Sequence, residues 1–104
     1  MDIPANEALD LNVLRQEIDR IDTELVALFS ARMQVSAAVA EYKRRTGKAV
    51  IDPAREAALL DRVAALSPPE TAGYTRALYV SILSLSRDYQ CEKPENAPVG
   101  KGRT

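Results

Sequence analysis

Apolar residues recur at alternating spacings of three and four along the first half of the chain. This heptad spacing is typical of a helix that packs one face against partner helices, and it predicts a helix from Leu11 to about Arg45. The stripe, called the seam below, consists of Leu11, Leu14, Ile18, Ile21, Leu25, Leu28, Arg32, Val35, Val39 and Tyr42. Arg32 is its one charged member. A buried guanidinium needs an anion, a water-filled cavity or a route to the surface, although a snorkelling or register-setting role is the simpler explanation for a lone seam arginine.

The end of this long helix is marked by Gly47, a residue type that commonly follows the last helical turn. Lys43, Arg44 and Arg45 lie in that turn, where cations favour the negative end of the helix dipole. For Arg44 and Arg45 this role is a sufficient explanation. Lys43 stays a candidate for chemistry, because it lies one turn beyond the seam residue Val39.

Two shorter helices are predicted downstream. Asp52 before a proline predicts an N-cap and a helix from Pro53 to about Leu66. A third helix begins at Glu70 or at Tyr74, since Ser67 and Glu70 have the spacing of a capping box. No strand pattern and no repeat is visible. The predicted fold is therefore all-α, with one long and two shorter helices.

The remaining segments are predicted to be poorly ordered. We expect a flexible N-terminus over residues 1–9, a helical domain over 10–90, and a disordered tail over 91–104 that is rich in proline and glycine. A helix of about 36 residues is roughly 54 Å long at 1.5 Å per residue. Two short helices cannot cover it on all sides, so we predict a homodimer in which the long helices pack together.

Composition narrows the possible functions. Lys and Arg number 14 against 15 Asp and Glu, and a net charge of −1 argues against general nucleic-acid binding. No apolar run is long enough to span a membrane, and the single cysteine fits a reducing compartment, so we expect a cytoplasmic protein. Histidine is absent, which excludes Ser-His-Asp catalysis as usually built and most zinc sites. We expect neither a metal nor a cofactor.

Several polar residues lie on otherwise apolar faces. Lys43 follows Arg32 by eleven positions, close to three turns, so both project from nearly the same face about 16 Å apart. The other candidates are Arg15, Asp52, Arg55, Glu56, Ser86 and Gln90. Each has a structural alternative, such as a surface charge, a helix cap or a fraying helix end. Together they favour a site for a small, multiply anionic molecule, because arginine binds carboxylates bidentately.

Arg15 precedes Arg32 by seventeen residues, roughly 25 Å along one rigid helix. One small ligand cannot easily contact both from the same subunit. In an antiparallel pairing of long helices, Arg15 would approach the site of the partner. The predicted site is then shared between subunits.

This set of residues resembles the all-helical AroQ class of chorismate mutases. The resemblance covers about residues 10 to 90 and is carried by Leu14–Asp22, Leu28–Arg32, Lys43, Asp52–Glu56 and Ser86–Gln90. It implies an intertwined dimer of three-helix subunits that converts chorismate to prephenate in phenylalanine and tyrosine biosynthesis. An isomerase of this kind requires no cofactor.

The resemblance also implies roles for the candidate residues. Arg32 and the partner subunit's Arg15 would bind the two carboxylates, and Lys43 and Gln90 would hydrogen-bond the ether oxygen. Glu56 would hold the ring hydroxyl together with the backbone near Asp52. Arg55 and Ser86 would complete the polar lining, and an apolar wall would come from Val39, Leu59 and Leu83.

The reaction so implied suits a chain without histidine. A Claisen rearrangement needs no nucleophile and no proton transfer, only a folded substrate and donors for the charge that grows on the ether oxygen. Gln90 donates at any pH, so activity should persist at neutral pH. Two alternatives stay open: an isochorismate-pyruvate lyase on the same scaffold, and a non-catalytic helical dimer that serves as an interaction module.

Overall fold

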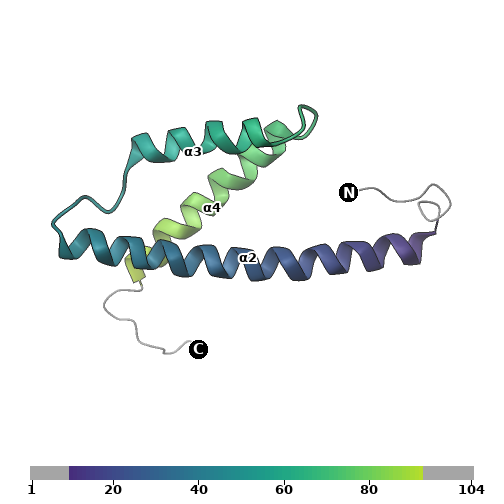
Figure 1. Ribbon diagram of the computed structural model, residues 1–104, viewed down its shortest axis with the longest axis horizontal. Coiled ribbons are helices and arrows are strands. Elements are labelled where there is room, and N and C mark those ends of the chain that lie inside the picture. The colour runs from purple at the N-terminus through teal and green to yellow at the C-terminus, as the bar shows by residue number, and fades with distance from the viewer. Residues whose placement is uncertain (1–9, 93–104) are drawn as a thin grey trace. The chain divides into compact units, whose positions relative to one another are not determined.

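The computed structural model describes residues 10–92, which form three helices and no strand. These are α2 (Leu11–Arg45), α3 (Pro53–Leu66) and α4 (Ala72–Glu92), drawn in Figure 1. The prediction of an all-α fold with one long and two shorter helices is confirmed. Residues 1–9 and 93–104, expected to be flexible ends, lie outside the described residues. Cys91 and Glu92, which we assigned to the tail, belong to the last turn of α4.

Asp10 begins the long helix. Its carboxylate oxygen Oδ1 accepts the backbone N–H of Asn12 at 2.9 Å, and its carbonyl oxygen accepts that of Leu14 at 3.0 Å. The first N–H groups of a helix have no partner within the helix, so a side-chain acceptor here stabilises the first turn. The start of α2 is therefore fixed locally by the sequence.

Gly47 ends α2. Its φ of 75° lies in the left-handed region, which glycine adopts without steric cost. Because the chain turns at Gly47, the Lys48 N–H donates to the Lys43 carbonyl at 2.8 Å and the Gly47 N–H donates to the Arg44 carbonyl at 3.3 Å. This pair of bonds is a Schellman motif, and it satisfies carbonyls that the helix itself leaves without partners.

The start of α3 matches the prediction, whereas the prediction that Ser67 and Glu70 form a capping box before α4 is wrong. Asp52 has an extended backbone, and its side chain accepts the Arg55 N–H at 3.1 Å, as an N-cap does. Ser67 instead closes α3, because its N–H donates to the Ala64 carbonyl and its hydroxyl to the Val63 carbonyl. The side chain of Ser67 is thus engaged with the preceding helix, and α4 begins only at Ala72.

The core lies between α3 and α4. Leu59 and Val63 of α3 pack with Leu83 of α4, and Leu60 and Tyr79 cover this cluster. The chain divides into two compact units, Met1–Arg32 and Met33–Thr104, and the division falls within α2. The core belongs to the second unit.

The seam of α2 is exposed along much of its length. Of its 35 residues, only Ala40 is buried. Ile18 and Leu25 are 55% and 54% exposed, and Leu28 and Val35 reach 68% and 63%. Large apolar side chains at regular heptad positions are not expected to remain in water, so this stripe is a candidate interface.

None of the helices over residues 10–92 has the length and apolar character that crossing a membrane requires.

The left-handed conformation of Gly47 gives a stability prediction. Gly47→Ala should lower the free energy of unfolding by about 1 kcal/mol, because an L residue is disfavoured at this φ while no atom lies within 4 Å of the added Cβ. Gly73→Ala is the matched control: it also adds a Cβ in open space, but within α4, and should be neutral or stabilising. Chemical unfolding at one fixed protein concentration measures both, and equal effects would contradict the assignment.

Candidate functional site

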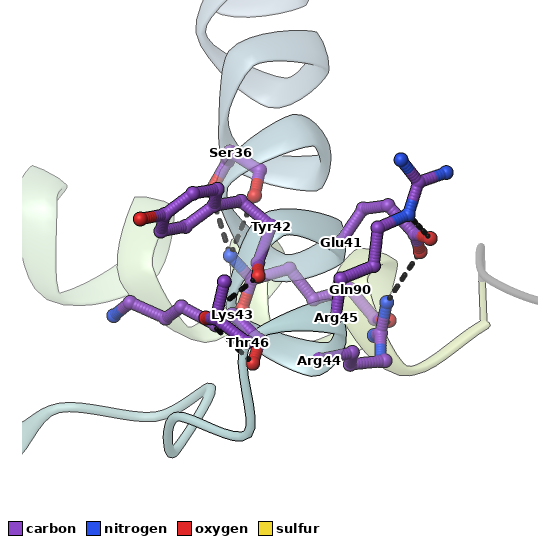
Figure 2. A network of polar contacts seen from close by, with 8 residues as sticks. All are labelled: Ser36, Glu41, Tyr42, Lys43, Arg44, Arg45, Thr46 and Gln90. Carbon is purple, nitrogen blue, oxygen red and sulfur yellow. Dashed lines mark hydrogen bonds and ion pairs between the residues drawn. The ribbon is translucent and has the colours of Figure 1, made fainter.

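Gln90, near the end of α4, contacts the last turns of α2 within the second unit (Figure 2). The amide nitrogen Nε2 of Gln90 donates to Ser36, with 2.9 Å to its hydroxyl oxygen and 3.1 Å to its carbonyl oxygen. Gln90 is half-buried, as is Ser36. The predicted donor on α4 is therefore held against the helix that carries Lys43.

Arg44 contacts the same glutamine from the other side. Its Nη2 donates to the Gln90 carbonyl oxygen at 2.6 Å, and its Nη1 lies 3.5 Å from Glu41. Arg45 also pairs with Glu41, at 2.8 Å, while its own side chain is largely exposed. The helix-dipole explanation is thus incomplete for Arg44, which in addition fastens the end of α4 to α2.

Lys43 is half-buried at the end of α2, where its Nζ lies 3.5 Å from the Val50 carbonyl oxygen. Seven residues separate it from Ser36, which is two helical turns, so both residues lie on one face of α2. Ser36 in turn holds the Gln90 amide. The cationic donor of Lys43 and the amide donor of Gln90 are therefore both assigned to this face of α2.

Ser86 is the one buried polar residue among those described, with 4% of its surface exposed. Its hydroxyl lies 3.5 Å from the sulfur of Met33, and it follows Leu83 by three positions on α4. The polar end of the α4 stripe that the sequence indicates is therefore buried, one helical turn before Gln90.

Glu56 is paired with a cation that the sequence analysis did not select. Its Oε1 accepts a hydrogen bond of 2.6 Å from Nη1 of Arg87 on α4. Asp52 acts as the cap of α3: its carboxylate accepts the Arg55 N–H at 3.1 Å, and its carbonyl oxygen accepts the Glu56 N–H at 3.0 Å. Arg55 is exposed in the first turn of α3.

Arg15 and Arg32 belong to the first unit, unlike the other predicted site residues. Arg15 is exposed, whereas Arg32 is half-buried within the seam. Elsewhere in this unit, Arg20 donates a hydrogen bond to Glu17. This bond and the negative charge of Glu17 raise the pKa of the Arg20 guanidinium, with a smaller contribution from Glu24. That network is solvent-exposed and sequence-local, and we assign it no role in the site.

Among residues 10–92, no group of three or more Cys, Asp or Glu side chains is placed to hold a metal ion. The arrangement consists of guanidinium, ammonium, amide, hydroxyl and carboxylate groups. The guanidinium, ammonium, amide and hydroxyl groups can bind anions and stabilise developing negative charge by donating hydrogen bonds.

Comparison with known proteins identifies the family. The chain matches the chorismate mutase type II family over residues 14–91. It belongs to this family. The intracellular chorismate mutases of Mycobacterium bovis and Mycobacterium tuberculosis are each 34% identical to it over 59 residues, which is 57% of this chain. The chain thus matches 56% of the length of these curated relatives. No solved structure gives a significant match.

Membership of the type II chorismate mutases confirms the resemblance inferred from the sequence. The match extends across every predicted site residue from Arg15 to Gln90. Ser36, Arg44 and Arg87 are additional polar residues of this region that sequence reasoning missed. A serine two turns before Lys43 on the same helix face was a signal available for Ser36. For Arg87, only its opposite charge to Glu56 was visible, which does not define a partner.

The ion pair between Glu56 and Arg87 should contribute more to stability than a more exposed ion pair between the same two helices, α3 and α4. Arg87→Gln leaves a half-buried carboxylate without its cation, and should lower the free energy of unfolding by about 1 kcal/mol. Arg76→Gln removes the same charge from a more exposed pair with Asp61 and should cost only about 0.3 kcal/mol. Urea unfolding of both variants provides the comparison, and a larger loss for Arg76→Gln would reverse this ranking.

Proposed function

We propose that this protein is a chorismate mutase, an isomerase that converts chorismate to prephenate by a Claisen rearrangement. The observation that carries the proposal is the family match over residues 14–91, which contains all the predicted site residues in order. The polar groups around Gln90 and Lys43 support it, because they are hydrogen-bond donors and the rearrangement requires no proton transfer.

The substrate carries two carboxylates, and two arginines are proposed to bind them. Arg32 supplies one guanidinium from its own subunit, and Arg15 of the partner subunit supplies the other. Bidentate contacts of this kind fix the orientation of a carboxylate as well as its position. Held at both carboxylates, the substrate's enolpyruvyl side chain is kept folded over the ring, in the geometry in which the new C–C bond forms.

Lys43 and Gln90 are proposed to stabilise the transition state. As the C–O bond breaks, negative charge grows on the ether oxygen, and donors directed at this atom bind the transition state more strongly than the ground state. The Gln90 amide does not titrate, so it remains a donor at neutral pH. Activity at neutral pH is therefore expected.

The ring end of the substrate is assigned to the start of α3. Glu56 accepts from the ring hydroxyl with the oxygen that Arg87 does not engage, and the backbone near Asp52 contributes a second contact. Arg55 and Ser86 complete the polar lining. Val39, Leu59 and Leu83 supply an apolar wall, which excludes water from the reacting atoms.

We further propose that the active form is a homodimer in the cytoplasm. The exposed seam supports the dimer: Leu28 and Val35 are 68% and 63% exposed, and a second long helix would bury them. The names of the mycobacterial relatives and the single free cysteine support a reducing intracellular compartment.

Removal of the Lys43 donor tests the proposed mechanism. Lys43→Ala should lower turnover of chorismate about 10²-fold or more, by analogy with the loss of one oxyanion donor. Lys48→Ala is the matched control, because it removes a lysine from the exposed turn after α2, where Nζ only faces the Tyr42 ring at 5.8 Å. The rate of chorismate decay measures both. Near-normal turnover by Lys43→Ala would refute the assignment of Lys43.

Sharing of the site between subunits predicts complementation. Arg15→Ala and Lys43→Ala are each expected to be nearly inactive. A mixture refolded together contains heterodimers in which one site keeps both residues, so about a quarter of wild-type activity should return. If Arg15 acted within its own subunit, each site would lack one residue and the mixture would stay inactive.

A further inference from the structure

Gln90 is held at two points by residues of α2 to which the family resemblance assigns no role. Its side-chain nitrogen donates to the hydroxyl and carbonyl oxygens of Ser36, and its backbone carbonyl accepts from Arg44 (Figure 2). Both contacts bridge more than forty positions of the sequence, and they fix both the side chain and the main chain of one residue. Contacts of this kind would be needed if the Gln90 amide has to donate a hydrogen bond in a defined direction.

A glutamine near a helix end is poorly fixed by its own helix. Gln90 lies two residues before the last residue of α4, where helices fray and where carbonyl groups lack partners within the helix. Its side chain has three rotatable bonds, and ordering it costs up to about 2 kcal/mol. A catalytic donor, however, has to be held within about 0.5 Å and 10–20° of its working position. External contacts must therefore supply the order.

Ser36 supplies the order of the side chain. Both of its acceptors belong to one residue, so they approach the amide nitrogen from the same side, and one N–H can be shared between them as a three-centre bond. The second N–H is then directed away from Ser36 and can donate to a ligand. Ser36 lies two turns before Lys43 on one face of α2, so the amide is held beside the face that carries the other proposed donor.

Arg44 supplies the order of the main chain. Its charged hydrogen bond of 2.6 Å reaches one of the last carbonyls of α4, where the helix dipole is negative. Arg44 also pairs with Glu41, one turn earlier on α2, with 3.5 Å between Nη1 and Oε1. The side chain is only 34% exposed, whereas that of the neighbouring Arg45 is 77% exposed.

We propose that Ser36 and Arg44 are positioning residues, which orient the Gln90 donor toward the ether oxygen of the substrate. The proposal rests on the proposed function. It assigns to the end of α2 two tasks: Lys43 presents a donor directly, while Ser36 and Arg44 hold the donor that α4 presents.

Steady-state kinetics of the full chain with chorismate test this assignment. Ser36→Ala removes one acceptor but leaves the carbonyl oxygen, so kcat should fall about fivefold, the effect of one neutral hydrogen bond. Arg44→Met removes a charge-assisted bond, and kcat should fall about tenfold or more. KM should change less than kcat in both, because the carboxylate contacts that bind the substrate are elsewhere.

Two matched controls separate positioning from loss of charge or stability. Arg45→Met removes the same charge from the same turn and also loses a pair with Glu41, but its kcat should stay within about twofold of wild type. Arg44→Lys keeps a cation of similar reach and should recover part of the lost rate. Equal losses in Arg44→Met and Arg45→Met would overturn the role of Arg44.

A double-mutant cycle asks whether Ser36 acts through Gln90. In a Gln90→Leu background the donor is absent, so adding Ser36→Ala should cause no further loss of kcat. A further fivefold loss in that background would mean that Ser36 acts elsewhere, and would overturn the proposal. Thermal unfolding confirms that every variant is folded at the assay temperature.

A spectroscopic readout is independent of turnover. In ¹⁵N-labelled protein, the side-chain amide signals of Gln90 are identified by their loss in Gln90→Leu. Ser36→Ala should move them toward the positions of a solvent-exposed amide and speed their exchange with water, whereas unchanged signals would overturn the inference. A wild-type protein with no chorismate turnover, by contrast, would refute the proposed function itself. The two failures are thus distinguishable.

Discussion

The exposed apolar seam of the long helix α2 is the constraint on which the proposed dimer and the proposed site depend. α2 has 35 residues, whereas α3 and α4 have 14 and 21 and bury their apolar residues mainly against each other. Only one residue of α2 is buried, and its apolar seam is exposed at several heptad positions. Burial of such a stripe requires another long surface of the same periodicity. A second copy of the chain has such a surface, and in the proposed homodimer it would bring its Arg15 to the site.

Fixed hydrogen-bond donors explain how a chain without histidine could support the proposed reaction. Hydrogen-bond donors that are fixed before the substrate arrives need not reorganise during the reaction, and this preorganisation is a large source of rate enhancement. At the end of α2, Lys43 contacts the Val50 carbonyl and Ser36 holds the Gln90 amide. For a rearrangement without proton transfer, rigid donors of this kind are a sufficient chemical inventory. The polar groups that this fold holds in place therefore support the proposed function.

Much of the fold could be predicted because its signals are local. Asp10, Gly47 and Asp52 each determine a helix end through contacts within a few residues. The ends that the sequence analysis assigned to Gly47 and Asp52 are found in the structure. Ser67 shows the limit of such reasoning, because its hydroxyl had two possible local partners and binds the preceding helix. Spacing alone did not distinguish them.

The candidate site was predictable only in part, because its remaining contacts join distant segments. Some of the predicted residues have unusual types for their positions, such as the buried hydroxyl of Ser86 in an apolar stripe. Arg44 and Arg87 are ordinary surface residues in a helical sequence, and only the packing of helices gives them the Gln90 carbonyl and Glu56 as partners. Such partnerships depend on the tertiary structure and leave no periodic signal.

The most direct test of the account is the fate of chorismate mixed with the purified protein. The decay of its absorbance is followed while chromatography identifies the product, and Arg32→Ala serves as the variant that lacks a carboxylate contact. The account predicts rapid formation of prephenate, lost in the variant. No turnover of chorismate would contradict it: release of salicylate from isochorismate would then indicate a lyase, and inertness toward both substrates a non-catalytic helical dimer.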